Sequence, residues 1–175
     1  MGSIFKNLKT TALAGDFSYV GKGRYWARID KVKHDKTRKK VEFISIEMTI
    51  LTVIPGNEPA DNRVGEEVNR FIQISGSDYA EKDFVQFLCG TLGLSPSELP
   101  EGADDWACAD DQPLRGVVVE MDNKVITLES GKLFTKVKFC REVPVAEVLN
   151  NLPPELVNRF FPNNFLGNKL AAEKA

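Results

Sequence analysis

The stretch Val41-Glu-Phe-Ile-Ser-Ile-Glu-Met-Thr-Ile-Leu-Thr-Val-Ile54 decides the fold class of this sequence. Its side chains alternate between an apolar set and a polar or aromatic set, namely Ile44, Ile46, Met48 and Ile50 against Phe43, Ser45, Glu47 and Thr49. A period of two predicts a β-strand with one buried face. Because most strands have only about 5 to 6 residues, a strand this long usually curves around a barrel.

A basic segment precedes this strand. Residues 22–40 read Lys-Gly-Arg-Tyr-Trp-Ala-Arg-Ile-Asp-Lys-Val-Lys-His-Asp-Lys-Thr-Arg-Lys-Lys, with nine basic residues against two acidic ones, whereas the whole chain has a formal net charge of −2. Residues 24–32 alternate as a strand, with Tyr25, Ala27 and Ile29 on one side and Arg24, Trp26 and Arg28 on the other. Residues 33–40 lack apolar side chains and predict a turn or a mobile hairpin tip. Such a concentration of positive charge indicates a surface that follows a phosphate backbone.

The rest of the chain supplies further strands and a helix. Residues 68–74 alternate as a third long strand, with Val68, Arg70, Ile72 and Ile74 opposite Asn69, Phe71 and Gln73. From Ser77, a suitable N-cap, to Gly93, a suitable stop, helical spacing predicts a helix that buries Phe84, Phe87 and Leu88. The other expected elements are a loop at residues 55–65, a short helix within the acidic segment 101–111, and strands at residues 116–121, 125–128 and 133–141.

Three strands, a helix and then two or three strands is the order of elements in an oligonucleotide/oligosaccharide-binding (OB) barrel, which binds ligands across its second and third strands. We therefore expect a mainly β fold, an OB-type curved five-stranded barrel with an α-helix between strands three and four. Residues 1–20 would form an N-terminal arm, residues 21–143 the OB-type nucleic-acid-binding domain, and residues 144–175 a C-terminal extension. The alternative, an α+β sheet with a helix on one face, fits the long strand 41–54 less well.

Three stretches carry a family resemblance, namely residues 23–32 (Gly-Arg-Tyr-Trp-Ala-Arg-Ile-Asp-Lys-Val), 67–74 (Glu-Val-Asn-Arg-Phe-Ile-Gln-Ile) and 114–120 (Leu-Arg-Gly-Val-Val-Val-Glu). Together they look like bacteriophage single-stranded DNA-binding proteins of the OB type. The resemblance implies a viral protein that protects single strands during DNA replication or recombination, with replication proteins as further partners. Many such proteins end in an acidic tail that recruits those partners, whereas this chain ends Gly-Asn-Lys-Leu-Ala-Ala-Glu-Lys-Ala.

Binding of single strands without sequence preference needs cations along the backbone path and flat rings on which bases stack, each stack contributing about 1 to 3 kcal/mol. The expected binding residues are the cations and rings of the predicted strands and hairpin tip: Arg24, Trp26, Arg28, Lys33, Lys36, Arg38, Lys39, Lys40, Phe43, Arg70, Phe71, Phe134, Lys136 and Lys138. The alternatives are that Trp26 packs in the core, that Phe43 and Phe71 form a satellite hydrophobic cluster, and that the basic tip is a solvated turn.

Catalysis finds little support in the sequence, and neither a cofactor nor a metal is expected. His34 is the only histidine, and no Gly-rich phosphate loop is present. The pairs Asp104-Asp105 and Asp110-Asp111 are compatible with a metal-dependent nuclease, but adjacent acids here are more typical of a helix start. The widely spaced Cys89, Cys108 and Cys140 predict reduced, mostly buried thiols.

No apolar run approaches the roughly 20 residues of a membrane span, so we expect a cytoplasmic protein without a membrane partner. Residues 145–161 have apolar residues at helical spacing, interrupted by Pro153-Pro154, and either pack back on the barrel or dock on a neighbouring subunit, which would give self-association. The alternative function is a protein-interaction or virion structural module whose basic hairpin grips an acidic partner.

Overall fold

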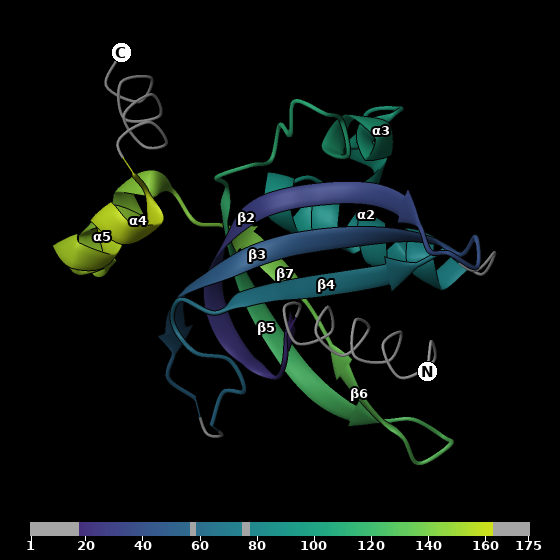
Figure 1. Ribbon diagram of the computed structural model, residues 1–175, viewed down its shortest axis with the longest axis horizontal. Helices are drawn as coiled ribbons and strands as arrows, with labels where there is room; N and C mark the ends of the chain where they lie inside the picture. The colour runs from purple at the N-terminus through teal and green to yellow at the C-terminus, as the bar shows by residue number, and fades with distance from the viewer. Residues whose placement is uncertain (1–17, 57–58, 75–77, 163–175) are drawn as a thin grey trace, which may run out of the picture.

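Figure 1 shows the computed structural model, which describes residues 18–56, 59–74 and 78–162. Its body is an open β-sheet with the strand order β1-β4-β3-β2-β5-β6, and β7 pairs with β5. The strands are β1 (Ser18–Tyr19), β2 (Gly23–Lys36), β3 (Glu42–Ile54), β4 (Glu67–Gln73), β5 (Val118–Thr127), β6 (Leu133–Lys136) and β7 (Phe139–Glu142). All ladders of the described residues are antiparallel except β1–β4. The chain is therefore mainly β, as expected, and no ladder among these strands closes the sheet.

The helices are α2 (Asp78–Leu92), the 3-10 turn η1 (Pro96–Glu98), α3 (Ala103–Ala107), α4 (Val145–Asn151) and α5 (Pro154–Phe160). Helix α2 lies between β4 and β5 in the chain, which confirms the expected helix after the third long strand. It ends where predicted, because Gly93 adopts a φ of +69° and its N–H donates to the Cys89 carbonyl at 2.9 Å. The expected N-cap, Ser77, lies outside the described residues. No described helix combines the length and apolarity needed to cross a membrane.

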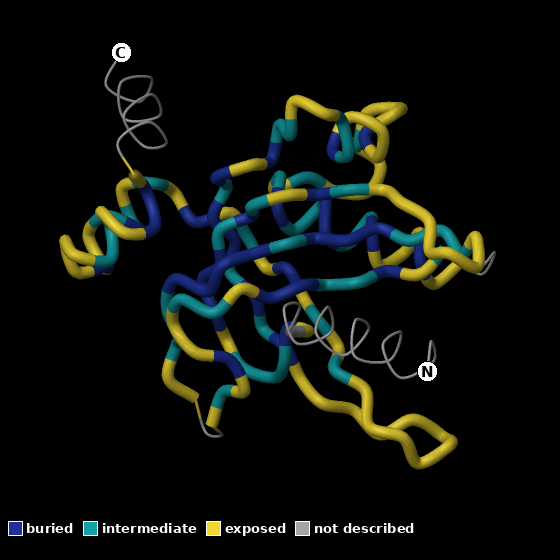
Figure 2. Tube along the Cα trace, viewed as in Figure 1, coloured by how far each residue is buried: buried dark blue, intermediate teal, exposed yellow. Residues whose placement is uncertain are grey.

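The inner face of the sheet packs against α2 and forms the main core (Figure 2). Tyr25, Ala27 and Ile29 of β2 are completely buried there, which confirms the predicted alternation as far as Ile29. A bulge at Asp30 then breaks the period of two, so Val32, expected on the other face, enters the same core. The predicted helical stripe is also confirmed, since Phe84, Phe87 and Leu88 are all buried. The Phe87 ring joins α2 to β7, because its centroid lies 4.8 Å from that of Phe139 in an edge-on arrangement.

A β-bulge turns part of β3 toward the outer face of the sheet. Trp26 pairs with Thr52 and Ala27 with Ile50, so Leu51 is the extra residue between them. Leu51 consequently joins a second core under α4 and α5, formed by Trp26, Leu51, Val118, Val143, Val148, Leu152, Phe160 and Phe161. The described part of the C-terminal segment therefore packs back on the sheet, which confirms the first of the two expected arrangements.

Two expected strand boundaries are wrong. The strands predicted at 116–121 and 125–128 are the single strand β5, because the polar triplet 122–124 is not a turn. Within it Asn123 is buried, donates from Nδ2 to the Gly21 carbonyl at 3.1 Å and accepts from the Lys138 N–H at 3.3 Å. That last bond engages Lys138 between β6 and β7, so the strand predicted at 133–141 is interrupted there.

The short parallel strand β1 has no counterpart among the expected elements. It belongs to the segment predicted as an N-terminal arm, residues 1–20, of which residues 1–17 lie outside the described part. Ser18 and Tyr19 pair with Val68 and Asn69 of β4, and the Val20 N–H donates to the Asn69 carbonyl at 3.1 Å. The described end of the expected arm is thus bound to the sheet.

The contact between α2 and β7 can be tested with a glycine-to-alanine change in a helix, which ordinarily stabilises a protein but should destabilise this one. A Cβ atom on Gly90 would lie 2.0 Å from the Phe139 carbonyl oxygen. Alanine favours a helix over glycine by about 1 kcal/mol, yet we expect Gly90→Ala to lower the free energy of unfolding by about 1 to 3 kcal/mol because α2 must move away from β7. Urea denaturation measures the change, with the exposed Lys82→Ala as the control on the same helix. A more stable Gly90→Ala variant would contradict this packing.

Candidate nucleic-acid interface

Two of the predicted rings meet on the outer face of the sheet. Phe43 of β3 and Phe71 of β4 stack with centroids 4.5 Å apart and an interplanar angle of 27°. The ladder pairs Phe71 with Ser45, so the rings are diagonal neighbours on adjacent strands, close enough for aromatic side chains to touch. Both residues are partly exposed. The alternation in β3 and β4 therefore places a pair of flat rings on the face opposite the main core.

Predicted cations extend from this face to the tip of the β2–β3 hairpin. Lys33 pairs with Ser45 across the ladder, and Lys36 with Glu42. Arg38, Lys39 and Lys40 form the exposed turn, which is closed by the Lys40 N–H donating to the Thr37 carbonyl at 2.9 Å. This end of the sheet lies opposite the end covered by α4 and α5 (Figure 1).

Two acidic residues of β3 partly neutralise the positive charge of this hairpin. The Lys33 ammonium lies 3.7 Å from a Glu47 carboxylate oxygen, and the Lys36 ammonium lies 3.5 Å from one of Glu42. Pairs this exposed contribute little to stability and are screened by salt, so both lysines can exchange their partner for a phosphate. The charge run in residues 22–40 thus overstated the local potential, because the opposing acids come from the next strand.

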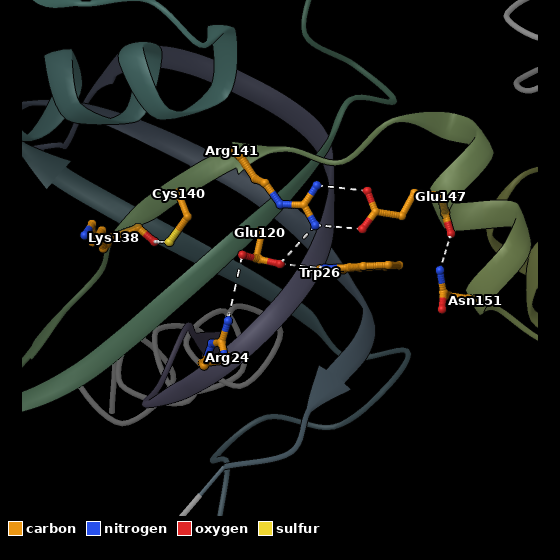
Figure 3. Close-up of polar contacts among 8 residues, drawn as sticks. All are labelled: Arg24, Trp26, Glu120, Lys138, Cys140, Arg141, Glu147 and Asn151. Carbon is orange, nitrogen blue, oxygen red and sulfur yellow. Dashed lines mark hydrogen bonds and ion pairs between the residues drawn. The ribbon is translucent and has the colours of Figure 1, made fainter.

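The structure corrects the expectation that Trp26 offers an open ring between two arginines. Only 7% of Trp26 is exposed, and its indole N–H donates to Glu120 Oε1 at 3.1 Å. Figure 3 shows Glu120 at the centre of a network that also holds Arg24 and Arg141. Arg141 in turn forms a bidentate pair with Glu147 of α4, at 2.9 and 2.8 Å. The Arg141 guanidinium holds the pKa of Glu147 below its ordinary value, so the pair stays ionised at neutral pH.

Arg28 and Arg70 also serve the fold. Arg28 donates to the Phe160 carbonyl of α5 and pairs with Asp30 at 2.7 Å, which attaches the C-terminal segment to β2. Arg70 points to the α2 side of the sheet, where it pairs with Asp83 at 2.9 Å. The α5 packing that surrounds Arg28 is not encoded by the alternation, whereas the alternation already placed Arg70 on the face opposite Phe71. Arg70 nevertheless borders the hollow beside Phe71 that is described below.

The β5–β6 hairpin brings the last predicted residues to the surface. Its outer part is exposed on both faces and projects from the body (Figures 1 and 2). Phe134, 40% exposed, pairs with Ile126, and Lys136 pairs with Lys124, so a ring and two ammonium groups share one face. Lys138 is exposed just beyond β6.

Phe134 and Phe71 line a common hollow of about 280 Å³ between β4 and β6, although they are 63 positions apart in the chain. Tyr19 of β1 and Asn69 of β4 also line it. Sequence reasoning missed both residues, as it missed Lys124, because β1 was taken for part of an arm and Asp122-Asn123-Lys124 was left between two predicted strands. The run Phe17-Ser-Tyr-Val20, which is rich in residues that favour strands, was the available signal for β1 in the sequence.

The described residues offer no support for thiol or metal chemistry. Burial raises the pKa of the Cys108 thiol to about 11, with Asp104 and Asp105 adding to the shift, and burial also raises the pKa of Cys89 and Cys140. Thiolate, the nucleophilic form, is therefore scarce at neutral pH. None of the three cysteines is in a disulfide, but the expectation of mostly buried thiols is wrong, because Cys89 and Cys108 are half-buried and Cys140 is exposed. Within the described ranges, no three His, Cys, Asp or Glu side chains converge as a metal site requires.

The burial of Trp26 can be tested by its fluorescence. In a Trp106→Phe variant, emission from Trp26 should resist quenching by acrylamide because the second core covers the ring. In the matched Trp26→Phe variant, emission from Trp106, which is 45% exposed, should be quenched readily. Equal quenching of the two variants would show that α4 and α5 do not cover Trp26 in solution.

Comparisons with known proteins add no relative. Neither a scan against protein-family models nor a search of curated proteins found a match to this chain. The evidence for function therefore lies in the chain's own residues, above all in the Phe43–Phe71 pair, the basic hairpin and the projecting β5–β6 arm.

Proposed function

We propose that this chain binds single-stranded DNA without sequence preference and protects single strands during viral DNA replication or recombination, as a binding protein rather than an enzyme. One observation carries the proposal: a stacked pair of partly exposed phenylalanine rings lies on the face of the sheet opposite the main core, beside a basic hairpin. Rings of this kind accept bases of any sequence, because every base has a flat face.

The arrangement matches the two needs of single-strand binding. Lys33, which pairs with Ser45, shares the face of the rings, whereas Asp35 is the direct cross-strand neighbour of Phe43 and Lys36 lies on the opposite face. The exposed tip with Arg38, Lys39 and Lys40 extends the positive surface beyond the strands. Phosphates of a strand whose bases contact the rings would pass these cations. The order of elements and the pairing of β2 with both β3 and β5 support an OB-type barrel, since such barrels are partly open.

The phage family supplies the remaining parts of the proposal. A single-strand coat would act with replication proteins in the host-cell cytoplasm. Self-association through the C-terminal segment would have to use surfaces other than the apolar residues that α4 and α5 bury against Trp26 and Leu51. The groups left for it are the exposed residues of those helices.

A second candidate function, a protein-interaction or virion module, is favoured by a different feature. A groove of about 1350 Å³ lies between the loop after β3 and the β5 strand. Its lining mixes cations, such as Lys22 and Lys124, with acids, such as Asp61 and Asp122. Mixed charge suits a protein surface better than a phosphate backbone, so an acidic or neutral protein partner is the alternative occupant.

The electrostatic part of the proposal predicts salt-dependent binding. Affinity for a fluorescent single-stranded oligonucleotide should fall linearly with the logarithm of salt concentration, with a slope of about 0.7 per phosphate neutralised. Fluorescence polarisation measures the constants, with a duplex of the same sequence as the comparison. Affinity that does not change with salt, or that is higher for the duplex, would overturn the proposal and favour the interaction module.

The basic tip is tested by a matched pair of charge-neutral variants. Arg38→Gln with Lys39→Gln should weaken binding to all sequences about equally and reduce the salt slope by about 1.4, because phosphate contacts carry no base information. The control, Arg63→Gln with Arg159→Gln, removes the same charge from exposed positions in the loop after β3 and in α5, at the end of the sheet away from the hairpin tip. If both variants lose the same slope, the tip contributes only through net charge.

Loss of a ring, in contrast to loss of the basic tip, should change the affinity but not its salt dependence. Phe43→Ala and Phe71→Ala should each weaken binding by about 1 to 3 kcal/mol while leaving the salt slope unchanged, because stacking releases no counterions. Thermal melts identify any loss of folded protein, and affinities are compared only where the variant is folded. Wild-type affinity in both folded variants would show that the pair is a satellite cluster.

A further inference from the structure

The hollow between β4 and β6 has the size and walls of a site for one small flat group. Its volume is about 280 Å³, below the roughly 300 to 1,000 Å³ of pockets that take drug-sized ligands. Tyr19, Phe71 and Phe134 line it from three different strands. Three aromatic rings around a hollow of this size are suited to a planar ring system.

The hollow lies at the break in the sheet. β1 covers the edge of β4 only at Val68 and Asn69, and within the described residues no ladder joins β4 or β1 to β6. A ligand that enters here would lie between the two edges without displacing strand pairing. Phe71 is held by its stack with Phe43, so this wall of the hollow is fixed before a ligand arrives.

One residue that lines the hollow, Asn69, has a buried side-chain oxygen without a hydrogen-bond partner. Only 8% of Asn69 is exposed, and its Nδ2 donates to Ser45 Oγ at 2.5 Å. Among the described residues, Asn69 Oδ1 is one of two buried side-chain polar atoms that have no hydrogen-bond partner, and the other, Thr91 Oγ1, does not line the hollow. An unpaired buried carbonyl oxygen destabilises a fold unless a donor reaches it.

We infer that this hollow is a nucleobase subsite, in which an unstacked base lies among Tyr19, Phe71 and Phe134 and donates an N–H to Asn69 Oδ1. The inference rests on the proposed function and deepens it, because it names residues that hold one base apart from the Phe43 surface. A lone acceptor agrees with sequence-tolerant binding, since each DNA base has an N–H donor on its pairing edge, N3–H in thymine and an amino group in the others. Lys136 is exposed two residues after Phe134 on the same face of β6, and we assign it to the adjoining phosphate.

A chemical probe tests the hydrogen bond without any change to the protein. The ligands are two short thymidine oligonucleotides, one natural and one with a methyl group on N3 of each thymine, which removes the N–H donor but keeps the ring and the phosphates. Wild-type protein should bind the natural oligonucleotide more tightly. Asn69→Leu, which removes the acceptor, should bind the two with equal affinity, provided that its thermal melt shows it folded. Equal binding of both ligands by the wild type would overturn the hydrogen bond.

The rings are tested with exposed residues, whose loss leaves the core intact. Tyr19→Ala and Phe134→Ala should each weaken binding of the natural oligonucleotide about 5- to 150-fold at unchanged salt slope. The matched controls are Tyr79→Ala, 78% exposed against 71% for Tyr19, and Leu133→Ala, which neighbours Phe134; both should bind like the wild type. If Tyr19→Ala and Phe134→Ala also bind like the wild type, the hollow is no subsite.

Different results overturn the proposed function and the base subsite. Wild-type protein that does not bind the natural oligonucleotide, or binds it with no dependence on salt, overturns the proposed function and the subsite together. Wild-type protein that binds in a salt-dependent manner, but responds neither to the N3 methyl group nor to the changes at Tyr19 and Phe134, overturns the subsite alone.

Discussion

The double burial of β2 is the constraint on which the rest of the structure depends. This strand is hydrogen-bonded to β3 on one edge and to β5 on the other. In its first half Tyr25 and Ala27 enter the main core, while Trp26 enters the second core under α4 and α5. A strand that is paired on both edges and covered on both faces cannot shift its register without exposing one of the two cores. Its position therefore fixes β3, β5 and the C-terminal helices together.

This constraint separates the sheet into a structural end and an open end. Where α4 and α5 cover the outer face, Glu120 accepts a hydrogen bond from the Trp26 indole and forms ion pairs with Arg24 and Arg141. Cations and rings in this part are engaged in holding the fold. Beyond the reach of those helices, the same hairpin presents its lysines and the Phe43–Phe71 pair to solvent. One strand pair thus supplies both the scaffold and the proposed binding surface.

The gap between the edges of β4 and β6 is the feature of the sheet on which the proposed base subsite depends. An unpaired strand edge offers free backbone groups and is usually protected. Here the gap between β4 and β6 is lined by Tyr19, Phe71 and Phe134. Aromatic walls leave space for a flat ligand where a closed barrel would have a continuous ladder. Phe134, which lines that space, belongs to the β5–β6 arm, whose outer part is exposed (Figure 2). The proposed base subsite relies on this departure from closure, whereas the Phe43–Phe71 surface does not.

The sequence by itself determined the elements whose signal is local. Alternation fixed which faces of β2, β3 and β4 are apolar, and helical spacing with Gly93 fixed the stripe and the end of α2, because these follow from backbone geometry over a few residues. Tertiary structure alone decided the surroundings of Trp26, since its burial requires Leu51 on a bulge and helices more than a hundred residues away. It also decided the charge of the hairpin, through Glu42 and Glu47, and brought Tyr19 and Phe134 to Phe71. Contacts between distant segments depend on how strands pair and curve, and no local pattern encodes that.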